Sequence, residues 1–192
     1  MKFILLVSFF ILSACSMKEA PAMKVYSFAT PTVLEVSNNG YHKDKVLKVS
    51  YPVALKENLS SKMNYSYSLY DRGEYLNSRW SNNIIKLLQG SMVVSLSQSN
   101  LFRVVVPFAS DVEENFRLES TIFDFSHHVR GDKSYAIVTL QCTLIDAQTG
   151  KLLKVKRFSY KEHTTTTNAK GYAEATNRIM EKFSHDLVRW LN

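Results

Sequence analysis

The chain carries its clearest structural signal in the stretch SYAIVTLQCTLIDAQTGKLLKVKRFSYKEHTT, residues 134–165. In its first half, apolar side chains alternate with more polar ones at Ala136, Val138, Leu140, Cys142 and Leu144. A period of two places these side chains on one face of a β-strand. The run DAQTG at 146–150 then supplies turn-forming residues before a second extended segment. The stretch therefore predicts a β-hairpin over 134–145 and 152–165 with one buried face.

Further extended segments precede this hairpin. Residues 116–129 predict a third long strand, which would make a meander with the two strands of the hairpin. Shorter strands are predicted at 25–28, 46–51, 63–70 and 101–106, the last closed by Pro107. The runs Asn38-Asn39-Gly40 and Asp71-Arg72-Gly73 have the composition of turns.

Two segments have helical spacing instead. The first runs from Trp80 to about Ser97 and ends at Ser99-Asn100; its apolar positions are Trp80, Ile84, Leu87, Leu88, Met92 and Leu96. The second is capped by Asn168, and its apolar positions are Tyr172, Ala175, Ile179, Phe183, Leu187 and Trp190. Together these elements predict an α+β fold: a mainly antiparallel or mixed sheet with two amphipathic helices packed largely on one face.

The N-terminus has the pattern of a secretory signal. Lys2 precedes an apolar run at 3–12, and the sequence Leu-Ser-Ala-Cys ends at Cys15. This is a lipobox, and it predicts removal of residues 1–14 and lipidation of Cys15 by a diacylglyceryl group on the thiol and an acyl group on the freed amine. The alternative is an ordinary secreted protein with a cysteine near its cleavage site. Ser16 after the cysteine favours the outer membrane, with the chain facing the periplasm, over the inner membrane.

Residues 15–24 read as a lipidated N-terminus and tether, and residues 25–192 as a single domain. A hydrophobic content of 45% with 12% aromatic residues is typical of a folded globule. With Cys15 lipidated, Cys142 has no intramolecular partner, so no disulfide is expected. The formal charge of +7 favours anionic membranes or acidic partners, and outside the cytoplasm nucleic acid is not expected as a partner.

No catalytic, cofactor or metal site is expected. The sequence has no Gly-x-Ser-x-Gly elbow, no glycine-rich phosphate loop and no His-Glu-x-x-His motif. His127 and His128 are adjacent, so on a strand they point to opposite faces and cannot share a metal ion. The acidic residues 111, 113 and 114 are interpreted as a solvated loop, and Cys142 as a buried, unreactive thiol.

Two surfaces leave alternatives open. The aromatic residues between 65 and 80 either line an apolar ligand groove or serve ordinary packing; they are Tyr65, Tyr67, Tyr70, Tyr75 and Trp80. The basic residues of the last helix either contact anionic lipid or an acidic partner, or are simply solvated; they are Lys170, Arg178, Lys182 and Arg189.

The order of features resembles a known family. A lipobox is followed by Val25-Tyr26-Ser27-Phe28, by Trp80 before an amphipathic helix, by Ser99-Asn100-Leu101-Phe102-Arg103-Val104-Val105, by the turn at 146–150 and by the final helix. Over about residues 25–191 this pattern is similar to that of the ABC-type transport auxiliary lipoproteins, of the paraquat-inducible lipoprotein type. The segment 58–79 departs from the family pattern, because it is rich in Tyr, Ser and Asn where the family often has a more apolar strand.

The resemblance implies a non-enzymatic role beside an ABC transporter whose periplasmic component carries mammalian-cell-entry domains, moving phospholipid or other apolar molecules between the two membranes. The implied partners are that protein and the transporter subunits, and self-association into a ring is compatible with docking. Two other classes remain: an envelope lipoprotein that activates a cell-wall synthase, and, ranked last, a lipoprotein hydrolase.

Overall fold

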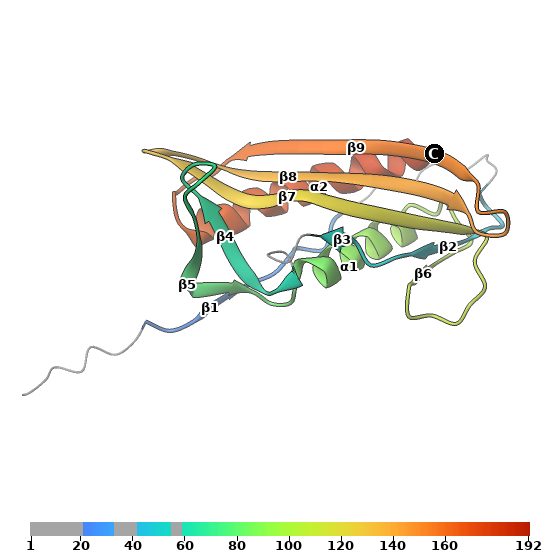
Figure 1. Cartoon of the computed structure of the whole chain (residues 1–192). Helices are drawn as coiled ribbons and strands as arrows, with labels where there is room; N and C mark the ends of the chain where they lie inside the picture. Colours follow the sequence, from blue (N-terminus) through green and yellow to red (C-terminus); the bar gives the residue numbers. More distant parts are fainter. Residues whose placement is uncertain (1–20, 33–41, 55–58) are drawn as a thin grey trace, which may run out of the picture.

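The computed structural model describes residues 21–32, 42–54 and 59–192. Within those ranges, nine strands form one mixed sheet and two α-helices pack against it (Figure 1). The predicted α+β class is therefore confirmed. The turn expected at Asn38-Asn39-Gly40, like Cys15, lies outside the described residues.

The longest strands form the predicted meander. β7 (Phe116–Arg130), β8 (Lys133–Asp146) and β9 (Leu152–His163) pair antiparallel in succession. The side chain of Asp146 accepts hydrogen bonds from the amides of Gln148 and Thr149 at 3.1 and 2.9 Å, and Gly150 has φ +70°. The turn thus forms at 146–150 as predicted, and it is held by a carboxylate that caps local amides and by a glycine in a left-handed conformation.

β7 is the strand with which most of the others pair. Along the edge opposite β8 it pairs in parallel with three short strands in succession: β2 (Val46–Val49), β3 (Val53–Ala54) and β4 (Lys62–Ser66). The outer strands are then added to these: β6 (Val104–Pro107) lies parallel to β2, β5 (Arg72–Trp80) antiparallel to β4, and β1 (Lys24–Tyr26) parallel to β5.

Both helices cover the same face of the sheet, and each begins at an asparagine cap. The Asn83 side chain accepts from the Lys86 amide ahead of α1 (Ile84–Gln98), and that of Asn168 accepts from the amides at 170 and 171 ahead of α2 (Ala169–Leu191). The helices meet where Ser95 Oγ donates to Ser184 Oγ at 2.8 Å. α1 ends as expected, because Asn100 has a left-handed φ of +56°.

The buried apolar side chains form one cluster between the helices and the sheet. Every alternating residue of the predicted hairpin face belongs to it, with Cys142 fully buried. Its largest member is Trp80, whose ring makes edge contacts with Phe28, Phe125 and Tyr172 at centroid distances of 5.5, 6.2 and 5.5 Å. Such edge-to-face aromatic contacts add to the stability that area burial provides.

The sequence-based assignment of residues 63–83 was wrong in three respects. Trp80 does not open the helix but ends a nine-residue strand, β5, that was not predicted. The strand expected to reach Tyr70 ends at Ser66. The turn lies at 67–71 and not at 71–73, since the amides of Tyr67 and Ser68 both donate to the Asp71 carbonyl. The Ser66 hydroxyl donates to the Ser68 carbonyl at 2.6 Å, which closes the turn at this point.

Candidate functional site

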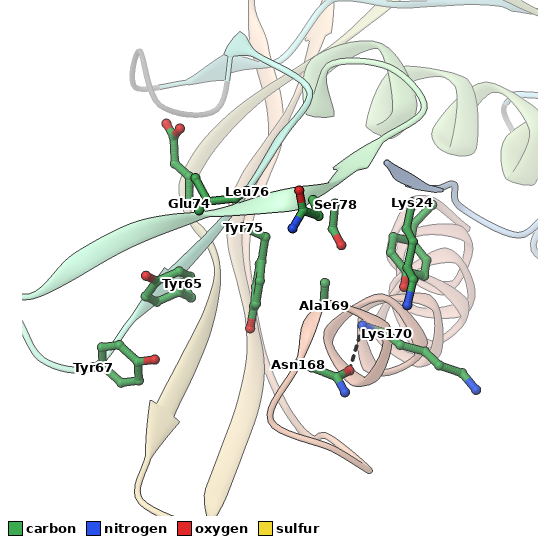
Figure 2. Close-up of a pocket in the computed structure, with 12 residues that line it drawn as sticks. Lys24, Tyr65, Tyr67, Glu74, Tyr75, Leu76, Ser78, Asn168, Ala169 and Lys170 are labelled. Carbon is green, nitrogen blue, oxygen red and sulfur yellow. Dashed lines mark hydrogen bonds between the residues drawn. The ribbon is translucent and has the colours of Figure 1, made fainter. Parts of the chain in front are cut away.

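A cleft of about 480 Å³ opens between β5, β4, β1 and the first turn of α2 (Figure 2). We call it the tyrosine cleft. It is lined by Lys24, Tyr26, Tyr65, Tyr67, Glu74, Tyr75, Leu76, Asn77, Ser78, Asn168, Ala169 and Lys170. Three of the five aromatic residues proposed from the sequence as a groove therefore do line one, whereas Tyr70 is exposed and Trp80 belongs to the core.

The tyrosines of the cleft are arranged as a contiguous group. The Tyr65 ring lies 5.1 Å from the rings of both Tyr67 and Tyr75, centroid to centroid. Gly73 makes this arrangement possible, because a Cβ there would lie only 2.5 Å from the Tyr65 hydroxyl oxygen. The absence of a side chain at 73 thus lets the Tyr65 ring lie across β5.

A buried histidine lies behind the tyrosines. The Tyr75 hydroxyl and His127 Nδ1 share a hydrogen bond of 2.7 Å, and the His127 ring stacks on Tyr172 at 5.1 Å with an interplanar angle of 2°. Burial, and secondarily the neighbouring His128, lowers the pKa of His127 from 6.5 to about 4. Burial, and secondarily Tyr67 and Tyr65, raises the pKa of Tyr75 well above its usual value. The pair is therefore neutral at pH 7.

The first turn of α2 forms one wall of the cleft. Its cap is complete, since Asn168 Oδ1 accepts from the amides of Lys170 and Gly171 at 3.0 and 3.2 Å. A Cβ at 171 would lie 2.3 Å from the Thr166 carbonyl oxygen, so only glycine fits this close approach. The basic groups of the cleft are the side chains of Lys24 and Lys170 (Figure 2). Together the walls offer aromatic faces, two cationic side chains and the Glu74 carboxylate, which pairs with Lys62 at 2.6 Å; such a lining suits binding better than bond cleavage.

The adjacent histidines separate as the sequence indicated. His127 is fully buried under the helices, whereas His128 is partly exposed and its Nε2 lies 3.4 Å from Asp124 Oδ2. Within the described ranges, no three His, Cys, Asp or Glu side chains are grouped so that they could hold a metal ion. Cys142 is buried in the apolar cluster, which raises the pKa of its thiol to about 12.

The acidic loop before β7 is held by ion pairs. Glu114 contacts Lys48 Nζ at 2.7 Å and Arg117 Nη2 at 2.6 Å. Hydrogen bonds from these two cations lower the pKa of the Glu114 carboxyl to about 2. Glu114 is thus a structural anchor between β2 and β7, whereas Asp111 and Glu113 are exposed, as expected for a solvated loop.

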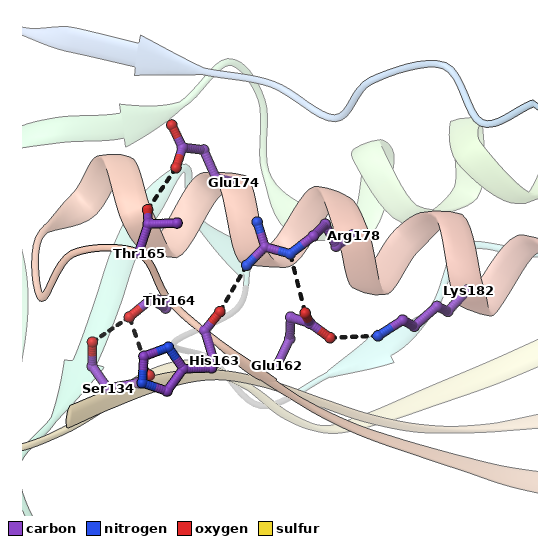
Figure 3. A network of polar contacts seen from close by, with 8 residues as sticks. All are labelled: Ser134, Glu162, His163, Thr164, Thr165, Glu174, Arg178 and Lys182. Atoms are coloured by element: carbon purple, nitrogen blue, oxygen red, sulfur yellow. Dashed lines mark hydrogen bonds and ion pairs between the residues drawn. The ribbon is translucent and has the colours of Figure 1, made fainter.

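The basic residues of α2 bind the helix to the sheet (Figure 3). Glu162 on β9 accepts from Arg178 Nε at 3.1 Å and from Lys182 Nζ at 2.5 Å, and Arg178 Nη2 also donates to the His163 carbonyl at 2.7 Å. Lys182, followed by Arg178, lowers the pKa of the Glu162 carboxyl. This network accounts for two of the four basic residues that the sequence offered as a contact for anionic partners.

None of the helices in the described part of the chain has both the length and the apolarity needed to span a membrane.

Sequence reasoning missed β5, which supplies Tyr75 and one wall of the cleft, and it missed the packing of His127. The polar run Ser81-Asn82-Asn83, which holds the true cap of α1, is the signal that could have placed Trp80 in a strand.

The sequence of the chain matches that of a known family. The sequence model of the family described as "ABC-type transport auxiliary lipoprotein component" matches residues 26–188. No curated protein matches the chain. Among solved structures, protein XCC0632 from Xanthomonas campestris has a TM-score of 0.74 and 18% identity, with 87% of this chain and 94% of that chain covered.

A second solved structure, that of an uncharacterized protein, has a TM-score of 0.70 and 13% identity, with 90% of this chain and 100% of that chain covered. At these identities the likeness concerns the fold. A structure of a PelC dodecamer from Paraburkholderia phytofirmans has a TM-score of 0.48 and 11% identity, with 79% of this chain and 94% of that chain covered.

Proposed function

We propose a function for this chain on the basis of its family: it belongs to the ABC-type transport auxiliary lipoprotein components. It is an auxiliary lipoprotein of ABC-type transport, held at a membrane by lipid. In our proposal it is the non-catalytic docking component of a system whose periplasmic subunit carries mammalian-cell-entry domains. That system moves phospholipid or other apolar molecules between the inner and outer membranes.

The proposal assigns the parts of the chain as follows. Residues 1–14 are a signal peptide, Cys15 carries the lipid, residues 15–24 are a tether and residues 25–192 are the auxiliary domain. Ser16, next to the lipidated cysteine, directs the protein to the outer membrane, where the domain faces the periplasm. Lipidation at a single cysteine that carries several acyl chains gives stable anchoring without a spanning helix.

The observation that carries this proposal is the family match over residues 26–188, which includes nearly all of the proposed domain. The chemistry of the tyrosine cleft agrees with a role in binding. Tyr75, which is half-buried in its wall, and the buried His127 behind it are hydrogen-bonded to each other and neutral at pH 7, so neither is poised to transfer a proton near that pH. Energy for transport would come from the ATPase subunit.

The deciding experiment is purification of the full-length lipoprotein, tagged at its C-terminus, from its own envelope in mild detergent, with mass spectrometry of co-purifying proteins and lipids. We expect a mammalian-cell-entry-domain protein together with its permease or ATPase. Recovery of a cell-wall synthase, or of no partner in several detergents, would contradict the assignment. The matched control is the Cys15→Ala variant, which we expect in the soluble periplasmic fraction; a variant that stayed fully membrane-bound would refute anchoring through Cys15.

A further inference from the structure

The most exposed apolar side chains of the described residues lie on one hairpin. Tyr70 is 96% exposed, Leu76 87% and Leu69 79%, and all three belong to the β4–β5 hairpin, where Tyr67 is also exposed. Exposed apolar residues are common singly, but a concentration of the largest ones on one element marks a contact surface. We call Leu69 and Tyr70 the hairpin tip.

The tip is held away from the core by an ordered turn. Ser68 Oγ accepts from the amides of Tyr70 and Asp71 at 3.2 and 3.1 Å, and the Tyr67 amide donates to the Asp71 carbonyl at 2.8 Å. These bonds order the backbone of the turn, and both apolar side chains project from it into solvent. The fold therefore leaves unused the stabilisation that their burial would provide.

The tether enters the domain close to this hairpin. β1 lies parallel to the end of β5, with Lys24 opposite Ser78, so the chain that precedes Lys24 enters the domain beside one strand of the hairpin. β1 and the hairpin lie at the same end of the molecule, away from the C-terminus (Figure 1). Nine residue steps separate Cys15 from Lys24, and nine separate Leu69 from Ser78. Each of these segments spans at most about 30 Å.

This geometry brings the tip within reach of the membrane that holds the anchor. A linker of nine residue steps keeps the domain and the membrane at a mutual effective concentration on the order of millimolar, so even a weak contact between them is populated. The side chains suit such a contact, because tyrosine sits at the level of lipid headgroups with its hydroxyl hydrated, and leucine enters the acyl region. Lys24 and Lys170, in the adjacent tyrosine cleft, can approach lipid phosphates.

We propose that the hairpin tip inserts into the interface of the bilayer that holds the lipid anchor, as a second membrane contact of the folded domain. The contact sets the orientation of the domain and opens the tyrosine cleft at the membrane surface. This inference rests on the proposed anchoring at Cys15, but its test separates the two.

The test uses the full-length lipoprotein with Tyr70→Cys, labelled with an environment-sensitive fluorophore and reconstituted into vesicles of phosphatidylethanolamine and phosphatidylglycerol at a ratio of about 3:1. The labelling is selective, because Cys142 is buried and the thiol of a lipidated Cys15 is blocked. The matched control carries the label at Val155→Cys, on β9, where the native side chain is 52% exposed. Flotation with the vesicles is measured first, and quenching by nitroxide-labelled lipid second.

We expect the label at 70 to shift to shorter emission wavelengths and to be quenched by the lipid-borne nitroxide, while the label at 155 stays in water. Adding Leu69→Ser should weaken the quenching at 70 without affecting flotation. Flotation with equal, water-like emission at both positions would overturn the inference and leave the anchor intact; it would assign the tip to a protein partner. Failure to float would overturn both proposals.

Discussion

Replacement of His127 should remove a specific part of the pH dependence of stability. His127 is fully buried, hydrogen-bonded to Tyr75 and stacked on Tyr172. Its pKa falls from 6.5 to about 4 in the folded chain, chiefly because burial disfavours the imidazolium. In the unfolded chain the imidazole therefore becomes protonated near pH 6.5, whereas in the folded chain it stays neutral down to about pH 4. The contribution of His127 to the free energy of unfolding is fully present above pH 6.5, declines as the pH falls toward 4, and is constant below that.

The size of the effect follows from linkage. The full shift corresponds to about 3 kcal/mol, and the part lost between pH 7 and pH 5 is about 2 kcal/mol. Urea unfolding of the Cys15→Ala protein, followed by far-ultraviolet circular dichroism, measures it directly. With a slope of about 2 kcal/mol per M, the His127 contribution lowers the midpoint by about 1 M between these two pH values.

The comparison uses two glutamine variants. His127→Gln should be less stable at pH 7, because ring stacking is lost, but its midpoint should fall by about 1 M less than that of the parent between pH 7 and pH 5. His128→Gln, on the partly exposed side of the same strand, should keep most of the parent's pH dependence. If His127→Gln and the parent lost the same stability over this interval, the reasoning from burial would be refuted.

Three further predictions concern packing. Trp80→Ala should reduce the free energy of unfolding by about 3 to 5 kcal/mol, because the ring is buried among aromatic side chains, whereas Trp190→Ala, at a partly buried position, should cost clearly less; equal losses in urea unfolding would contradict this ranking. Gly73→Ala should displace the Tyr65 ring, detected as a change in its NMR ring-proton shifts in a chain that stays folded; unchanged shifts would show that the close approach is relieved elsewhere. Glu162→Gln should remove both ion pairs to α2 and cost about 1 kcal/mol or less in urea unfolding, with a smaller cost at high salt, because its partners are partly exposed; a loss above about 3 kcal/mol would mean that the network does more than join two surfaces.

The parts of the fold that sequence could predict are those fixed by local rules. The hairpin of β8 and β9 follows from strict alternation and from Asp146 and Gly150 in the turn. α2 follows from the Asn168 cap and from apolar residues at steps of three and four. In both cases the apolar residues whose spacing predicts the element are the same residues that form its buried face, so the sequence pattern and the packing agree.

The error at Trp80 has a physical cause. Trp80 lies four residues before Ile84, so in the sequence it continues the apolar stripe of α1. The helix itself begins only after the Asn83 cap, which leaves Trp80 outside it. β5 is hard to recognise because its alternation breaks: Leu76 and Asn77 are both exposed. The tyrosine cleft depends in turn on the pairing of β4 with β7 and of β5 with β4, which are contacts that local sequence does not encode.

Which of the two adjacent histidines lies beneath the cleft is decided by an irregularity in β7. The register against β8 shifts between Ile122 and Asp124. Before this bulge the even-numbered residues, such as Leu118 and Ile122, are buried, and after it the odd-numbered residues Phe125 and His127 are buried. An extra residue in one strand moves every later side chain to the opposite face. Without it, strict alternation would bring His128 under the helices and leave Tyr75 without its partner. The sequence shows that the two histidines part; only the register determines which of them meets the tyrosine.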